Sequence, residues 1–109
     1  MLNNIMLVGR LSNDLEIVKE GEKEKVKLTL AVNRAFKNEE GIYETDFIDC
    51  VLWNTLASNV VEYCKKGDVV GVRGRLESKI NEETNLKEIV VVVDKLTFLS
   101  SKKVEDEEE

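Results

Sequence analysis

Residues 43–53 read YETDFIDCVLW, a strand whose two faces differ in character. Side chains alternate across a strand, so one face is apolar and holds Ile48, Cys50 and Leu52. The other face presents Phe47 and Trp53 on either side of a carboxylate, Asp49. That combination is typical neither of a core face nor of a solvent face. The first face is expected to line a core, whereas the second needs another explanation.

A helix is expected directly after this strand. Its apolar residues recur at helical spacing and are Leu56, Val60, Val61 and Cys64. Asn54 or Thr55 can cap the start of the helix. Lys65-Lys66-Gly67 is typical of a helix end, because basic side chains suit the negative end of the helix dipole and glycine reverses the chain.

Two further strands are expected before this strand and helix, and two after them. They cover Asn4–Leu11, Val26–Asn33, Val69–Leu76 and Ile89–Leu99. Polar segments separate them: a charged turn at Lys19–Lys25, a loop at Lys37–Gly41 and a hairpin tip at residues 81–88. This order predicts an all-β fold, the five-stranded Greek-key barrel called the OB-fold, with one helix between its third and fourth strands.

The last of these strands is apolar at every position from residue 89 to residue 93. Both of its faces are therefore expected to be covered. A small barrel has a single core, which covers one face only. A second copy of the chain is the simplest cover for the other face, so the pattern indicates a homo-oligomer.

The composition indicates one domain and excludes several classes of function. The 109 residues include two cysteines, no histidine and no proline, which excludes histidine-dependent catalysis and Cys/His zinc sites. Asp46 and Asp49 lie on opposite strand faces and Cys50 has no imidazole base, so an enzyme is not expected. No apolar run reaches the roughly 20 residues of a membrane span, and the first ten residues do not resemble a signal peptide. A cytoplasmic protein without a cofactor is expected.

The net charge of −6 is unevenly distributed. Residues 104–109 read VEDEEE and hold five acids, which leaves 16 bases against 17 acids in the rest of the chain. The chain is thus expected to consist of a nearly neutral domain, residues 1–100, and a short acidic tail, residues 101–109. The tail serves solubility alone, or it competes with an anionic ligand or recruits a partner.

Five segments in the same order resemble the bacterial and phage single-stranded DNA-binding protein family. They are NIMLVGRL (4–11), LAVNRAF (30–36), DFIDCVLW (46–53), EYCKKGD (62–68) and VGVRGRL (70–76). The resemblance covers residues 1–99. It implies an OB-fold that assembles as a homotetramer in the cytoplasm, associated with the nucleoid. It also implies binding of single-stranded DNA with little sequence preference, and protection of that DNA during replication, recombination and repair.

The resemblance also assigns the positions that stack nucleobases. The chemistry agrees, because a protein that binds single-stranded DNA needs flat aromatic rings for the nucleobases and a line of basic side chains for the phosphates. The stacking residues are Phe36, Phe47 and Trp53; for the two phenylalanines the alternative is a place in the core. The candidate phosphate contacts flank the same strands and are Arg10, Arg34, Lys37, Arg73, Arg75 and Lys79. Tyr43 either stacks or is structural.

Two features depart from the family pattern. The hairpin at KINEETNLKE (79–88) lacks the aromatic residue that family members commonly carry there, which predicts weaker binding. The acidic tail lacks the terminal aromatic through which cellular members recruit partners, so tail-mediated partners are not expected. An alternative function keeps the fold and drops the DNA: an oligomeric OB-fold protein-interaction module of replication restart.

Overall fold

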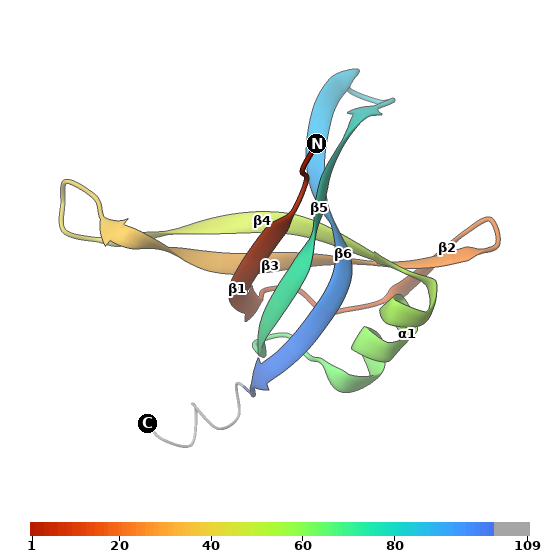
Figure 1. Ribbon diagram of the computed structural model, residues 1–109, viewed down its shortest axis with the longest axis horizontal. Helices are drawn as coiled ribbons and strands as arrows, with labels where there is room; N and C mark the ends of the chain where they lie inside the picture. Colours follow the sequence, from red (N-terminus) through yellow and green to blue (C-terminus); the bar gives the residue numbers. More distant parts are fainter. Residues whose placement is uncertain (102–109) are drawn as a thin grey trace.

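The computed structural model describes residues 1–101 as six strands and one helix (Figure 1). The strands are β1 (Ile5–Leu11), β2 (Ile17–Glu20), β3 (Lys23–Lys37), β4 (Tyr43–Trp53), β5 (Val69–Asn81) and β6 (Leu86–Ser100), and the helix is α1 (Asn54–Tyr63). The predicted acidic tail, apart from Ser101, lies outside the described residues. Within residues 1–101, no helix is long and apolar enough to cross a membrane.

The strands close into a barrel. The sheet order is β1-β5-β6-β4-β3-β2, and β1 closes the ring because Arg10 and Leu11 also pair with β3. β4 and β6 run parallel where Cys50 lies opposite Val91. Five strands therefore form the barrel and β2 extends it, with the helix between β4 and β5, so the predicted OB-fold is confirmed.

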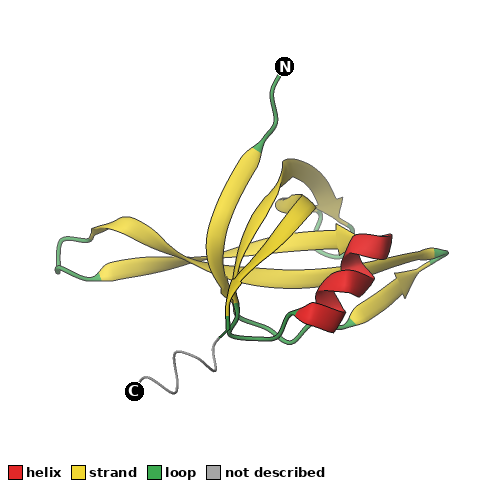
Figure 2. Ribbon diagram, turned by 60° about the horizontal axis from the view of Figure 1, so that its bottom comes forward, coloured by secondary structure: helices red, strands yellow, loops and turns green. Residues whose placement is uncertain are grey.

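The core lies inside this ring and follows the alternation in the sequence. The fully buried side chains include Leu11, Val26, Leu28, Leu30, Cys50, Leu52, Val70 and Val91. α1 packs against β3 and β4 and adds Ala57 and Val60 to the core (Figure 2). The predicted inner face of β4 is thus confirmed, and the opposite face of that strand points away from the core.

Three hairpin arms extend beyond the barrel, and the strands in them exceed the predicted lengths (Figure 1). The β3–β4 arm ends at the loop 38–42, the β5–β6 arm ends at the turn 82–85, and the third arm is β2–β3. Cover of the second face of residues 89–93 by another copy stays a prediction, but within this chain Ile89 is 64% exposed, unlike Val91, Val92 and Val93. The reason is that β6 has already left the barrel at this residue and runs along the arm.

The turn predicted at Lys19–Lys25 is instead the β2–β3 hairpin. Ile17–Glu20 pairs with Lys23–Val26, and the chain reverses at Gly21, whose φ is +65°. Main-chain pairing and a 2.8 Å ion pair between Lys25 Nζ and Glu20 Oε2 hold this ribbon together. All four residues of β2 are exposed, so apolar and polar residues do not alternate along this strand in the sequence.

Both predicted ends of the helix need correction. Trp53 occupies the N-cap position without a side-chain cap, and Asn54 begins the helix with a φ of +54°. The Asn54 side chain instead accepts a hydrogen bond from the Glu24 backbone N–H at 3.2 Å. The helix ends at Tyr63, before the two lysines, and the Asp68 carboxylate then accepts the Lys65 N–H at 2.8 Å.

Candidate nucleic-acid interface

The outer face of β4 carries two aromatic rings, the exposed Phe47 and the partly buried Trp53. Phe47 is 66% exposed, and the residue opposite it on β3 is the small Ala31. Trp53, at the other end of the strand, is partly buried and lies opposite Lys25. Phe36, on the β3–β4 arm, is 85% exposed. None of the three is therefore a core aromatic, and all can offer a flat face to a ligand.

Lysines of the β2–β3 hairpin surround the Trp53 ring. The Nζ atoms of Lys25 and Lys23 lie 5.5 Å and 5.8 Å from the ring centroid. Lys27 follows on the same face, because odd positions of β3 point outward while Val26 and Leu28 are buried. None of these three lysines was among the sequence candidates: Lys23 and Lys25 fall in the segment interpreted as a turn, and Lys27 lies on the outer face of the predicted strand 26–33. Their alternation with buried residues was the signal.

Lys79 joins this basic face from the β5–β6 arm. It lines a hollow of about 360 Å³ together with Lys27, Asp49, Glu88, Ile89 and Val90. The Lys25 ammonium lowers the pKa of Glu20 through a hydrogen bond and its charge, and Lys79 and Lys27 add to that effect. The lysines of the two arms therefore act on one region of the surface.

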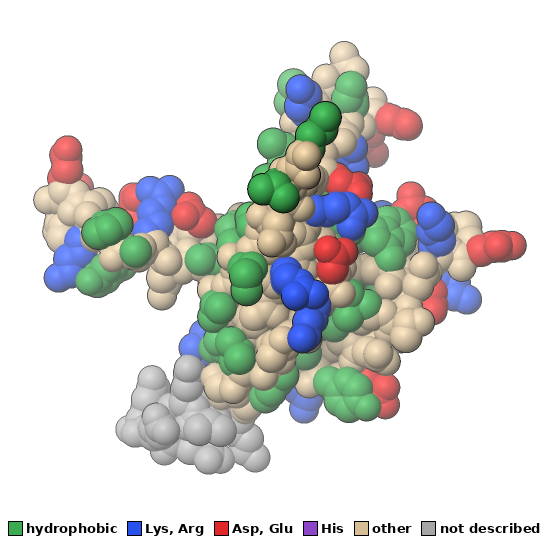
Figure 3. Space-filling view, viewed as in Figure 1, with side chains coloured by type: hydrophobic (Ala, Val, Ile, Leu, Met, Phe, Trp, Pro, Cys, Tyr) green, Lys and Arg blue, Asp and Glu red, His purple; other side chains and the backbone are tan. Residues whose placement is uncertain are grey.

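Two of the predicted phosphate contacts already have carboxylate partners. Arg34 donates to Asp46 at 2.9 Å and to Glu44 at 2.8 Å, so its pKa is raised and the pKa of Asp46 is lowered. Arg75 pairs with Glu77 at 2.8 Å and with Asp94 at 3.2 Å. Figure 3 shows acidic and basic side chains interleaved on the face of the molecule that it presents.

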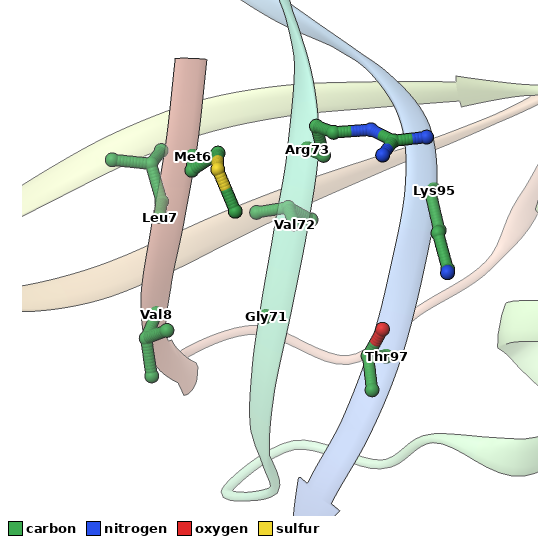
Figure 4. Close-up of a pocket in the computed structure, with 8 residues that line it drawn as sticks. All are labelled: Met6, Leu7, Val8, Gly71, Val72, Arg73, Lys95 and Thr97. Carbon is green, nitrogen blue, oxygen red and sulfur yellow. The ribbon is translucent and has the colours of Figure 1, made fainter.

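Arg10 and Arg73 lie apart from the aromatic row. The Arg10 guanidinium donates a 2.7 Å hydrogen bond to the Gly67 carbonyl, which ties β1 to the loop before β5. Arg73 lies opposite Lys95 on the outer face of β5 and β6 (Figure 4). Arg73 and Lys95 line a hollow of about 240 Å³ with the exposed Met6 and Val8 of β1. Within residues 1–101, Arg73 forms no ion pair.

The β3–β4 arm holds the remaining predicted residues. Phe36 lines a hollow of about 540 Å³ with Arg34 and Glu44. Lys37 lies opposite Tyr43, and its Nζ is 5.5 Å from the centre of the tyrosine ring. Phe36 and Tyr43 are both exposed, so this arm presents two aromatic rings and two basic side chains beyond the barrel.

The described residues hold no cluster of metal-ligating side chains, and the Cys50 thiol is buried. Within residues 1–101, no three Cys, Asp or Glu side chains come together as a metal site. Burial, with a smaller contribution from Asp49, raises the pKa of the Cys50 thiol to about 12, so this sulfur is protonated and unreactive at neutral pH.

Comparison with known proteins identifies the family. The sequence pattern of the "Single-strand binding protein family" matches residues 2–99. "Single-stranded DNA-binding protein B" of Bacillus subtilis (strain 168) is 42% identical over 106 residues, 94% of each chain. "Single-stranded DNA-binding protein 1" of Lactococcus lactis subsp. lactis (strain IL1403) is 38% identical over 99% of this chain and 75% of its own. The chain therefore belongs to the single-strand binding protein family, whose members bind DNA and are not enzymes.

Proposed function

We propose that this chain binds single-stranded DNA without sequence preference and protects it during replication, recombination and repair, in the cytoplasm at the nucleoid. The supporting observation is that the exposed Phe47 and the partly buried Trp53 share one outward strand face, with Lys23 and Lys25 beside Trp53 and Lys27 next along β3. Bases of any sequence have a π-face, so stacking on these rings gives binding without base readout. No cofactor takes part.

Stacking supplies the affinity on the β4 face and on the β3–β4 arm. Each stacked base contributes about 1–3 kcal/mol. Phe47 and Trp53 are six residues apart on one strand, about 20 Å at 3.3 Å per residue, so they hold different bases. Phe36 adds a third platform on the arm, where it is the most exposed of the three rings.

Phosphate neutralisation has to compete with carboxylates already in place. Lys37, Lys79 and Arg73 form no ion pair within residues 1–101 and can bind phosphate directly. Arg34 and Arg75 must exchange a carboxylate for a phosphate, which yields less net gain. We therefore expect moderate affinity that falls with added salt, because phosphate binding releases counterions.

We propose that the chain assembles as a homo-oligomer, with a tetramer as the expected form. Residues 5–9 of β1 pair only with β5 in the described chain, so the second edge of this strand is open to another strand. Met6 and Val8 on the same strand are 74% and 60% exposed. A second copy that pairs along this edge would cover both side chains and satisfy the open main-chain groups.

A second candidate function is a protein-interaction module that does not bind DNA. The β5–β6 arm favours it, because it has exposed apolar side chains and acids but no aromatic ring. These side chains are Leu76, Ile80, Leu86 and Ile89, with Glu77, Glu82, Glu83 and Glu88. The exposed rings on β4 and the β3–β4 arm favour DNA binding.

The test compares fluorescence anisotropy of labelled oligonucleotides: oligo(dT), a mixed-sequence single strand and a duplex of the same length. We expect both single strands to bind in a similar concentration range and the duplex to bind much more weakly, with affinity lost as salt rises. Equal binding of the duplex, or no binding of any strand at low salt, would reject the proposal. The second result would favour the protein-interaction module.

A further inference from the structure

We infer that Tyr43, backed by Lys37, forms an additional nucleobase-stacking site on the β3–β4 arm. The inference rests on the proposed function and extends the aromatic row of β4 beyond the barrel. Tyr43 and Phe47 occupy odd positions of one continuous strand, Tyr43–Trp53, and so share its outer face. They are four residues apart, about 13 Å along the strand, which is enough for each ring to hold its own base.

The surroundings of Tyr43 do not fit a structural tyrosine. Tyrosines that stabilise a fold bury the ring and usually find a hydrogen-bond partner for the hydroxyl group. The Tyr43 side chain is 55% exposed, and its hydroxyl makes no hydrogen bond within residues 1–101. Its side chain also takes no part in the buried core cluster. A half-exposed ring without such partners costs little to reorient against a ligand.

Lys37 equips this ring for a charged ligand. Its Nζ lies 5.5 Å from the ring centroid, and Lys37 is the cross-strand neighbour of Tyr43. A cation over one side of the ring leaves the other side to a base. Lys37 forms no ion pair within residues 1–101, so its ammonium can bind the phosphate next to that base. Glu39, Glu40 and Glu44 are the acids of the same arm.

The site also accounts for where the chain places its aromatic rings. The β5–β6 arm has none, since residues 77–90 contain no Phe, Tyr or Trp. The β3–β4 arm has both Phe36 and Tyr43, and the two rings are 85% and 55% exposed. The stacking surface is therefore shifted toward the β3–β4 arm. We expect a DNA strand bound along β4 to continue onto the β3–β4 arm rather than across the β5–β6 arm.

The test replaces Tyr43 by alanine and by phenylalanine and uses Tyr63→Ala as the matched control. Tyr63 is an equally polar aromatic, 71% exposed on α1, outside the proposed DNA face. We expect Tyr43→Ala to weaken oligo(dT) binding by about fivefold to a hundredfold and to reduce the nucleotides covered per chain. Tyr43→Phe should keep binding near the unmodified level, because stacking needs the ring and not the hydroxyl. Tyr63→Ala should leave binding unchanged.

A direct reporter separates stacking from an indirect effect. In a Trp53→Phe background, Tyr43→Trp gives the chain a single indole at the arm, and oligo(dT) should quench its fluorescence. The inference would be overturned if Trp53→Ala weakened binding but Tyr43→Ala did not. An indole at residue 43 that oligo(dT) does not quench would overturn it as well. Failure of the unmodified chain to bind would instead reject the proposed function itself.

Discussion

Replacing both Phe47 and Trp53 by alanine removes the two rings from the outer face of β4 and leaves the basic residues in place. The rings are about 20 Å apart along the strand, and residues more than about 10 Å apart act independently in most cases. Their contributions of about 1–3 kcal/mol each should therefore add to about 2–6 kcal/mol. At 1.4 kcal/mol per factor of ten, affinity for oligo(dT) should fall by about 30-fold to about 10⁴-fold.

The double variant should remain folded. Phe47 is 66% exposed, so its truncation removes little buried surface. Trp53 is partly buried and loses its contacts with Lys23 and Lys25, which should lower the free energy of unfolding by about 1–3 kcal/mol. Circular dichroism and urea unfolding check this point.

Anisotropy of labelled oligo(dT) measures the loss without relying on tryptophan fluorescence. The salt dependence of binding should stay close to that of the unmodified chain, because the phosphate contacts remain. A folded double variant that binds as tightly as the unmodified chain would refute the assignment of this face. An additive loss from the two single variants would support separate bases on each ring.

Three further predictions follow from individual contacts. Asp46→Asn should remove one of the two ion pairs of Arg34, whose pair with Glu44 remains, and so tighten oligo(dT) binding and raise the salt slope by less than roughly one unit, measured by titration at several salt concentrations. Arg34 holds the pKa of Asp46 below its usual range, so in the unmodified chain this pair breaks only in acid, as pH falls through that lowered value. Gly74→Ala should lower the free energy of unfolding by about 1–3 kcal/mol in urea, because a Cβ there collides with the backbone of β6, whereas Gly71→Ala meets only ordinary contacts and should be tolerated. Cys50 should react with a thiol reagent at pH 8 only after unfolding, since burial raises its pKa to about 12; rapid labelling of the folded chain would contradict its place in the core.

Alternation along single strands was enough to predict the barrel and the two faces of β4. Cys50 and Leu52 are buried and Phe47 is exposed, as the period-two pattern predicts. In a half-buried strand, apolar and polar residues alternate in the sequence as buried and exposed positions alternate in the fold. The helix was predicted from the spacing of residues such as Val60, which lies in the core. Its ends were not, since the backbone at Asn54 and the Asp68 carboxylate determine them, and neither shows in hydropathy.

The charge pairing on the candidate site depends on strand register, which the sequence does not reveal. The register shifts in β3 between Asn33 and Lys37, where Arg34 lies within reach of Asp46. In β6 the register shifts at Asp94, and its carboxylate contacts Arg75. A sequence shows that acids and bases are present, but a shift of one residue decides which of them meet.

The lysines beside Trp53 were missed for a different reason. They lie in a hairpin stabilised by main-chain pairing and by the Lys25–Glu20 ion pair, with no apolar face on β2. An exposed ribbon of this kind has no hydropathy period, so its residues are easily taken for a turn. The sequence thus predicts the aromatic residues of the candidate site, whereas the lysines nearest to Trp53 appear only in the structure.

The most direct test of the central claim is a titration of tryptophan fluorescence with oligo(dT), repeated with duplex DNA and at raised salt. Trp53 is the only tryptophan, so the signal has a single source. We expect strong quenching by the single strand, little by the duplex, and weaker quenching as salt rises, because the base stacks on Trp53 while nearby lysines hold phosphate. Binding of oligo(dT) with unchanged Trp53 fluorescence, or equal quenching by both nucleic acids, would contradict the account.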